Sequence, residues 1–361
     1  MYSICANSSP SGGGRGPMQR TAVVIYNLGG PDKLESVKPF LFNLFNDPLI
    51  LRQKAPIRWI LAKLISNRRA PTAKKIYAQI GGKSPILEET EKQARALEKA
   101  LRDEKSAEYR VFVAMRYWHP FAEECLNKIE EFAPNNIVLL PLYPQFSTST
   151  TESFLRAWNA IIEEKKINIP TSAVCCYPKE KNFIDTTARA IREEIEKPGI
   201  PQTDLKILFS AHGIPKKFVV AGDPYQTHVE KTVTAIVDDL DIPNLDYVTC
   251  YQSRVGLVEW LKPYTDTAIL DAANQGKAIM VVPVAFVSEH SETLVELDIE
   301  YRELALKNGA SDYIRIPTVG TTPEFIRGLV AMVKRAGNQS GRYINVGGEL
   351  CDRQCIACPL L

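Results

Sequence analysis

The chain has 361 residues, of which 45% are hydrophobic and 24% are charged, and its formal net charge is +2. This composition is typical of a globular protein with a sizeable core, and the length suffices for one large domain or two ordinary ones. The near-neutral charge gives no reason to expect nucleic acid as a partner, and without a run of about 20 apolar residues we expect no membrane-spanning helix.

The first predicted segment, residues 1–20, is rich in Ser and Gly and has no apolar stretch. We expect a disordered leader there and not a signal peptide. The chain holds eight cysteines, a number that in a small secreted domain would indicate a disulfide scaffold. In a chain of this length without an apolar leader, we expect reduced thiols and a cytoplasmic protein.

Eight short runs rich in β-branched residues follow, and they are the predicted strands. Runs such as 137–142 and 278–285 are apolar throughout, as in parallel strands that helices cover on both faces. Helical patterns at 88–104 and 183–197 alternate with the strands, which predicts a doubly wound α/β fold. The predicted strands lie at 21–27, 110–115, 137–142, 172–177, 205–210, 246–251, 278–285 and 312–316.

The strands divide into two groups of four, and polar loops follow corresponding strands in each group. We therefore expect two similar Rossmann-like halves with parallel sheets, residues 21–177 and 178–330, which face each other across a cleft. Residues 331–361 form a predicted C-terminal extension. Because ligands bind outside the carboxyl ends of parallel strands, the loops at these ends are the predicted site.

Two of the four histidines, His212 and His290, follow predicted strands. His212 lies in a tight turn with Gly213, and the helix predicted from about Ser291 carries Glu292, Glu296 and Glu300 at intervals of four. Residues at this interval share one helix face, so the carboxylates could pass protons or cations away from an imidazole. A solvated surface explains Glu296 and Glu300 equally well, and a structural histidine at a strand end is the alternative for His212.

Seven segments of the chain closely resemble ferrochelatase and follow one another in the order of that family, from about residue 21 to residue 330. They are NLGGPDKLESVKPFLFNLFND, IGGKSPI, MRYWHPFAEE, PLYPQFSTSTTES, FSAHGIP, YQSRVG and VAFVSEHSETLVELDIEY. The resemblance implies a lyase that inserts Fe2+ into protoporphyrin IX to form protohaem, the last step of haem biosynthesis. A ferrochelatase that prefers coproporphyrin III and a porphyrin or haem carrier without turnover remain the alternatives.

The resemblance also implies roles for individual residues. His212 and Glu292 are the expected catalytic pair, and with His290 and Glu296 they are the expected contacts of the metal. Imidazole titrates near neutrality and is suited to accept a pyrrole proton, while imidazole and carboxylate can replace the waters of Fe2+. The expected contacts of the porphyrin are Leu28, Tyr77, Arg116, Tyr117, Ser147, Trp260 and Phe286.

Apolar side chains beside Arg and Lys in residues 38–65 match the lip of the porphyrin entrance in the family. Such a surface suits peripheral membrane contact, so we expect a cytoplasmic protein that can associate with a membrane. A pair of amphipathic core helices is the alternative explanation of the same pattern.

Cys351, Cys355 and Cys358 crowd the last eleven residues. Three thiolates are one short of a four-thiolate site, and the resemblance implies a 2Fe–2S cluster on this tail, completed by a cysteine from the body of the protein. Cys176 is the expected fourth ligand, with Cys175 as the second choice. A structural zinc ion and inert thiols are the alternatives, and analogy with family members that carry such a tail predicts a homodimer.

Overall fold

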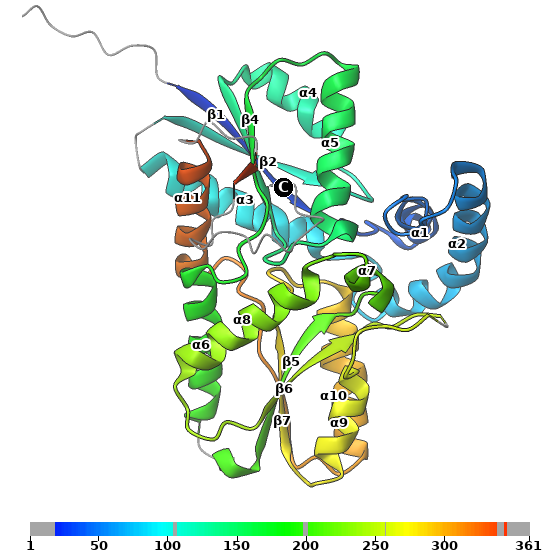
Figure 1. Cartoon of the computed structure of the whole chain (residues 1–361), viewed down its shortest axis with the longest axis vertical. Helices are drawn as coiled ribbons and strands as arrows, with labels where there is room; N and C mark the ends of the chain where they lie inside the picture. Colours follow the sequence, from blue (N-terminus) through cyan, green and yellow to red (C-terminus); the bar gives the residue numbers. More distant parts are fainter. Residues whose placement is uncertain (1–18, 104–106, 198–200, 257, 338–342, 345–361) are drawn as a thin grey trace, which may run out of the picture.

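Two parallel β-sheets, one in each half of an elongated molecule, form the framework of the fold (Figure 1). The computed structural model describes residues 19–103, 107–197, 201–256, 258–337 and 343–344. All eight predicted strands are present within them. The strands are β1 Arg20–Asn27, β2 Glu108–Met115, β3 Asn136–Pro141, β4 Thr171–Val174, β5 Leu205–His212, β6 Tyr247–Gln252, β7 Ala278–Pro283, β8 Tyr313–Arg315 and β9 Tyr343–Ile344.

The two sheets repeat one strand order. The first has the order β2-β1-β3-β4-β9 and the second β6-β5-β7-β8, and every pair is parallel. Apart from β9, the second, first, third and fourth strands of each half therefore lie side by side. Every residue of β7 is buried, as its continuous apolar run predicts for a strand covered on both faces. The predicted α/β fold with two Rossmann-like halves is confirmed.

Helices cover both faces of the sheets and bury one side each. In α3, for example, the side chains of Ala94, Leu97 and Leu101 recur every three or four residues and face the core. The helices and helical turns are η1 Leu34–Ser36, α1 Val37–Phe45, α2 Ala55–Ala78, α3 Ile86–Asp103, α4 Ala122–Phe132, η2 Thr148–Glu152, α5 Ser153–Glu164, α6 Lys181–Ile195, η3 Gln202–Asp204, α7 Lys216–Val220, α8 Tyr225–Leu240, α9 Thr265–Ala273, η4 Glu292–Glu300, α10 Tyr301–Lys307 and α11 Pro323–Gly337. No helix within these described segments is long and apolar enough to cross a membrane.

The halves meet at the carboxyl ends of their strands. Gln145, which follows β3, donates to the carbonyl oxygen of Val284 after β7 at 3.0 Å, and it is buried. Gln93 of α3 likewise donates to the carbonyl oxygens of Val287 at 2.8 Å and Gly320 at 3.0 Å. The loops that were predicted to carry the site thus lie against each other in the middle of the molecule.

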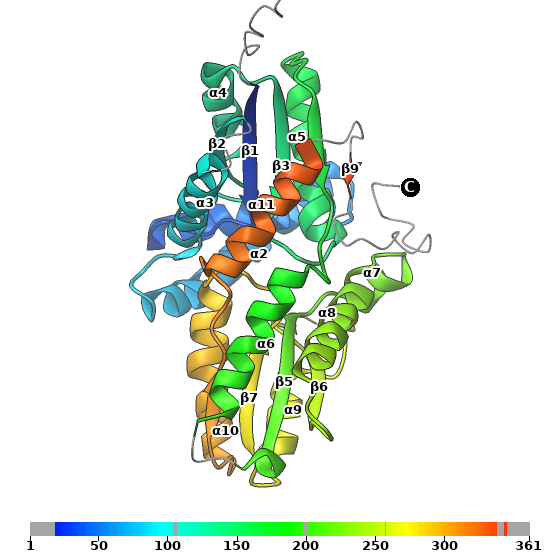
Figure 2. The same ribbon diagram turned by 90° about the vertical axis from the view of Figure 1, so that its left-hand side faces the viewer.

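One helix of the second half packs on the first. Figure 2 shows α11 crossing toward the first sheet, and it packs on α3, β3 and β4 as well as on α6. Buried residues of both halves form one continuous core, from Val23 of β1 to Val282 of β7. The predicted boundary at residue 330 falls inside α11, and the division into 21–177 and 178–330 stays a prediction.

Three local features differ from the prediction. β4 ends at Val174 instead of residue 177, because the chain leaves the sheet there and the Tyr177 amide donates to the Pro144 carbonyl oxygen at 2.7 Å. The unpredicted β9 pairs with β4. The segment Glu292–Glu300 is a π-helix, in which the Tyr301 amide donates to the carbonyl oxygen of Glu296 five residues earlier.

Candidate active site

The site centres on the carboxylate of Glu292, which lies between two imidazoles. His212 is the last residue of β5, and its Nδ1 atom lies 3.0 Å from Oε2 of Glu292. The Nε2 atom of His290, in the loop after β7, lies 3.5 Å from the same oxygen. The side chains of His212 and Glu292 keep 36% and 30% of their surface exposed, whereas that of His290 keeps 9%. The strand ends therefore bring these three predicted residues together and leave two of them open to a ligand.

The charged forms of His212 and Glu292 stabilise each other. Burial alone would lower the pKa of His212, but the Glu292 carboxylate outweighs burial and holds this pKa above its ordinary value of 6.5. Burial would raise the pKa of Glu292, yet His212 and His290 hold it well below its usual range. Glu292 is therefore a carboxylate at neutral pH, and His212 is a stronger base than a free imidazole.

Glu296 belongs to a separate network on the same π-helix. Its carboxylate accepts hydrogen bonds from the Ser253 amide at 2.9 Å, from Gln252 at 3.2 Å and from the Tyr301 hydroxyl at 2.8 Å. The Ser253 hydroxyl is a further donor. Glu296 thus ties the π-helix to the end of β6, and its predicted contact with the metal stays a prediction.

Arg116 and Tyr117, two expected porphyrin contacts, surround a buried carboxylate. Arg116 donates to Oδ2 of Asp47 at 2.7 Å, and the Tyr117 hydroxyl donates to the same atom at 3.0 Å. Ser153 joins them, since it accepts from Nε of Arg116 at 2.6 Å. Tyr117 is fully buried, and burial raises the pKa of its hydroxyl far above the ordinary value.

Ser147 faces the second half and not an open space. Its hydroxyl donates to Asp223 at 3.0 Å, and the Thr148 amide donates to the same carboxylate at 2.8 Å. These bonds join the π-turn η2 after β3 to the loop between α7 and α8.

Three of the four remaining expected porphyrin contacts, Phe286, Trp260 and Tyr77, lie beside neighbours of the catalytic pair. Phe286 packs on His290 with a ring distance of 4.5 Å, and the Trp260 ring lies beside Gly213, next to His212. Tyr77 and Leu28 belong to an apolar cluster that α1 and α2 form with Tyr117. The Ser291 hydroxyl donates to the Tyr77 hydroxyl at 3.4 Å, and burial raises the pKa of Tyr77 to about 12.

Sequence reasoning missed four residues around this site. Arg69 of α2 and Tyr225 of α8 both lie within the electrostatic influence of Glu292. Asp47 anchors Arg116, and Thr293 contacts His290. Thr293 and Asp47 carried a usable signal, since both lie inside segments that resemble the family.

Helix α2 exposes four apolar side chains, of which Ile57, Ile60 and Leu64 share one face. Ile57, Trp59, Ile60 and Leu64 keep 51%, 48%, 53% and 60% of their surface exposed. Lys63 lies over the Trp59 ring at 5.0 Å. In Figure 1, α1 and α2 project sideways from the body near the junction of the two halves.

Cys175 and Cys176 follow β4 and are buried against Phe146, with their Sγ atoms 3.5 Å apart. Cys351, Cys355 and Cys358 lie outside the described residues. Within the described part of the chain, no three His, Cys, Asp or Glu side chains are arranged to hold a metal ion. The expected metal and cluster ligands therefore stay predictions.

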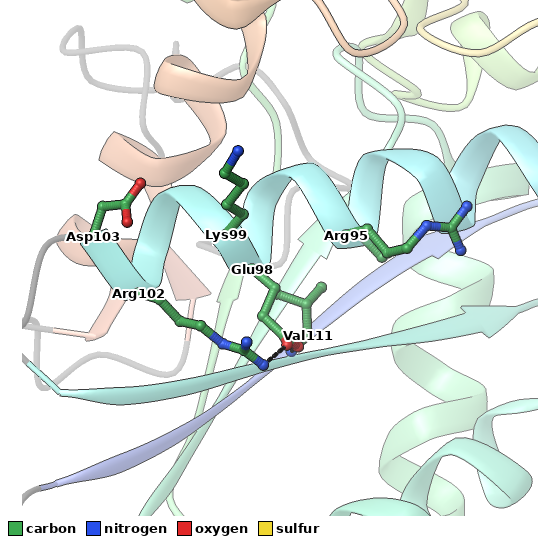
Figure 3. A pocket seen from close by; sticks show the side chains of 7 residues that line it. Arg95, Glu98, Lys99, Arg102, Asp103 and Val111 are labelled. Carbon is green, nitrogen blue, oxygen red and sulfur yellow. Dashed lines mark hydrogen bonds and ion pairs between the residues drawn. The ribbon is translucent and has the colours of Figure 1, made fainter.

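A surface pocket of about 330 Å³ lies away from these residues, between α3 and β2 (Figure 3). Glu98 accepts from the amide of Val111 at 2.8 Å and pairs with Arg102 along the helix. None of the residues that line the pocket is a predicted site residue, and Arg95 and Arg102 pair with Glu91 and Glu98 of the same helix.

Comparison with solved structures shows the fold. The structure of SirB from Bacillus subtilis with Fe3+ covers 90% of this chain and 97% of its own, with a TM-score of 0.51 and 12% identity. A sirohydrochlorin chelatase SirB from Bacillus subtilis subspecies spizizenii in complex with cobalt gives a TM-score of 0.50 at the same identity, with 90% of this chain and 98% of its own covered.

Comparison of sequences identifies the family. The family model described as Ferrochelatase matches residues 20–337. The ferrochelatase of Caulobacter vibrioides is 50% identical over 94% of this chain and 97% of its own. Those of Pelagibacter ubique and Rickettsia bellii are 47% and 48% identical, over 87% and 93% of this chain and 90% and 93% of their own. The predicted resemblance is thus confirmed, and the chain belongs to the ferrochelatase family of metal chelatases.

Proposed function

We propose that this enzyme inserts Fe2+ into protoporphyrin IX to form protohaem and releases the two pyrrole protons. The observation that carries the proposal is the position of the Glu292 carboxyl group between the imidazoles of His212 and His290, at the strand ends of the second half. A base and a metal-binding carboxylate must lie within reach of the same ring nitrogens, and this arrangement supplies both.

His212 is the proposed proton acceptor. A pyrrole N–H is a poor acid, and Glu292 strengthens the base by stabilising the imidazolium that forms. One pyrrole proton passes to His212, whose positive charge is balanced by Glu292, and the second proton is released to solvent. The two positive charges of Fe2+ balance the two negative charges of the deprotonated ring. Phe286 and Trp260 supply apolar and aromatic surface beside the pair, which suits a large flat ring.

Anaerobic metallation tests this function. The purified enzyme is mixed with Fe2+ and either protoporphyrin IX or coproporphyrin III, and haem is measured by absorbance. We expect turnover of protoporphyrin with a higher kcat/KM than that of coproporphyrin. Faster turnover of coproporphyrin would assign the other substrate, and porphyrin binding without metallation would indicate a carrier.

We propose that the apolar side of α2 contacts the membrane surface, from which a poorly soluble porphyrin can enter. Ile60 and Leu64 are four residues apart and highly exposed, and Lys63 and Arg68 beside them would face lipid head groups. We propose a cytoplasmic protein that binds the membrane reversibly, and sedimentation of the purified protein with vesicles of anionic lipid tests this contact. Ile60→Asp together with Leu64→Asp should abolish binding, whereas Leu306→Asp, at an exposed leucine of α10, should leave it unchanged.

We propose that Cys176 and the three tail cysteines hold a 2Fe–2S cluster. The support is the parallel pairing of β9 with β4, in which Ile344 lies beside Val174, the residue that precedes Cys175 and Cys176. Thiolates from both segments suit iron–sulfur or zinc. The cluster would be a redox-active group, and because metal insertion is not a redox reaction, no step above uses it.

Metal analysis and absorbance of the anaerobically purified protein test the cluster. Cys176→Ser should abolish the cluster absorbance, and Cys250→Ser, at another buried cysteine, should retain it. If the protein contains zinc but neither iron nor sulfide, the cysteines hold a structural zinc ion instead of a cluster. A homodimer is also proposed by analogy with family members that carry a cysteine tail, and sedimentation equilibrium would reveal it or a monomer.

A further inference from the structure

We propose that residues 46–54, the loop between α1 and α2, form a clasp that links the two halves and detaches at Arg52 to let porphyrin pass. The fixed end of the clasp is Asp47, and its releasable end is Arg52. This inference rests on the proposed porphyrin substrate and concerns its entry and exit, not its metallation.

The fixed end is the carboxylate of Asp47, which is buried in the first half. Its Oδ2 atom accepts from Arg116 at 2.7 Å and from the Tyr117 hydroxyl at 3.0 Å, and Oδ1 accepts from the Leu49 amide at 2.7 Å. Only 1% of the Asp47 side chain is exposed. Because breaking a buried ion pair leaves a charge without a partner away from water, this end stays attached.

The releasable end is the guanidinium of Arg52, which reaches the second half. Its Cζ atom lies 4.1 Å from the ring centroid of Phe218 in α7, and Nη2 donates to the Thr148 hydroxyl at 3.2 Å. Thr148 in turn donates to Asp223 of the second half at 2.7 Å. Arg52 is exposed, whereas Phe218 is buried. An exposed cation over an aromatic ring makes a weak contact, so this end can detach.

The clasp lies at the start of a helix that passes the catalytic pair. Among the described residues, α1 and α2 pack with Tyr117 in a cluster of their own, apart from the core that both halves share. Contacts with the second half lie near both ends of α2. They are Arg52 just before the helix and Tyr77 in its last turn, whose hydroxyl accepts from Ser291 at 3.4 Å. Because Ser291 adjoins Glu292, detachment of Arg52 frees the start of this helix to move away from the site.

A clasp of this kind affects passage in both directions. When porphyrin passes only while Arg52 is detached, a weaker contact raises the detached population. The rate constants of association and dissociation then rise by the same factor, and the dissociation constant stays unchanged. A residue that merely holds bound porphyrin, or supports the fold of its site, changes the dissociation constant instead.

Stopped-flow fluorescence of protoporphyrin IX tests the clasp in the full chain without metal. Association is followed on mixing, and dissociation is followed by transfer of bound porphyrin to excess apomyoglobin. Arg52→Met keeps an unbranched side chain over Phe218 but loses the charge and the bond to Thr148. Both rate constants should rise about 2–5-fold, as expected for loss of an exposed cation–π contact, with an unchanged dissociation constant. The exposed position of Arg52 should leave the fold intact.

Two further variants check the partner and the specificity of the effect. Phe218→Leu removes the ring, and its combination with Arg52→Met should be no faster than Arg52→Met alone, because the contact is already lost. Arg20→Met is the matched control. It removes a guanidinium that lies 4.3 Å from the ring centroid of Phe132, with both residues in the first half, and should change neither rate constant.

Unchanged rate constants in Arg52→Met would overturn the clasp, as would faster dissociation with unchanged association. Haem formation plays no part in this measurement. If the predicted rates are found but the wild type forms no haem with Fe2+, the proposed function is refuted and the clasp stands.

Discussion

At the scale of single residues, Glu292 reverses the effect of burial on His212. Burial is the largest influence on the pKa of this imidazole and lowers it, but the neighbouring carboxylate raises it beyond the ordinary value. The stability that the ion pair contributes is therefore fully present below pH 6.5 and is lost as the pH rises through the higher pKa of the folded state.

NMR titration of the His212 ring measures this balance. In the wild type we expect a pKa above 6.5, and in Glu292→Gln a lower pKa, because burial is then opposed only by the charge of Glu296. Glu300→Gln, on the exposed part of the same π-helix, serves as the control and should leave His212 nearly unchanged. A pKa in Glu292→Gln as high as that of the wild type would show that another group sets the charge of His212.

Gly213 fixes the direction in which His212 points. A Cβ atom at this position would lie 3.0 Å from the carbonyl oxygen of Gln252 and 3.3 Å from the Trp260 ring. Gly213→Ala therefore requires Gln252 or Trp260 to shift by a few tenths of an ångström next to His212, and catalytic rates are sensitive to the placement of a reacting group. We expect kcat to fall about 10–100-fold, while Gly337→Ala, where a Cβ meets only one atom at 3.8 Å, leaves it unchanged. Wild-type kcat in Gly213→Ala would contradict this.

At the scale of elements, the π-helix brings the acidic side chains to the end of the sheet. π-helical turns are rare in proteins, and those that occur often lie at functional sites. Here one such turn follows the third strand of each half, η2 after β3 and η4 after β7. Glu296 anchors the second of them to Ser253, whose backbone has a left-handed φ of 64°. The anchor thus stabilises both an unusual helix and an unfavourable loop conformation.

Glu296→Ala should therefore destabilise the fold. Its donors would lose their common acceptor, at a cost of about 1–3 kcal/mol for each group left buried without a partner. Urea unfolding measures the change, with Glu300→Ala as the control at an exposed position. A loss below about 0.5 kcal/mol, the range of ordinary surface substitutions, would show that Glu296 is not a structural anchor.

The elements were more predictable than their contacts. Strands such as β3 and β7 stood out because burial on both faces requires continuous apolar runs. The polar residues at the end of β5 and after β7 then located His212 and Glu292. The π-helix was not predictable, because four-residue spacing of carboxylates fits α- and π-helical turns alike. Asp47 and Arg69 escaped notice because each meets its partner across a large distance in sequence.

At the scale of the whole molecule, the two halves share one core. Buried residues of β1, α3, α6, α8, β7 and α11 are in continuous contact, and Gln93 bridges the halves with two bonds to backbone carbonyls and one accepted from Ser288 at 2.8 Å. The repeated strand order therefore does not make two independent folding units.

Calorimetry should show a single unfolding transition for the intact chain. Gln93→Leu leaves buried polar groups of the second half without a hydrogen-bond partner. Each such group lowers the free energy of unfolding by about 1–3 kcal/mol, so the single transition should move to lower temperature without splitting. Two separate transitions in the wild type would contradict a shared core.

The central claim is that His212 accepts protons during metal insertion. Wild type and His212→Ala are loaded with protoporphyrin IX without oxygen, mixed with Fe2+, and followed by absorbance through a single turnover. The account predicts that both bind porphyrin equally and that only the wild type forms haem at an appreciable rate. Haem formation by His212→Ala at the wild-type rate would contradict it.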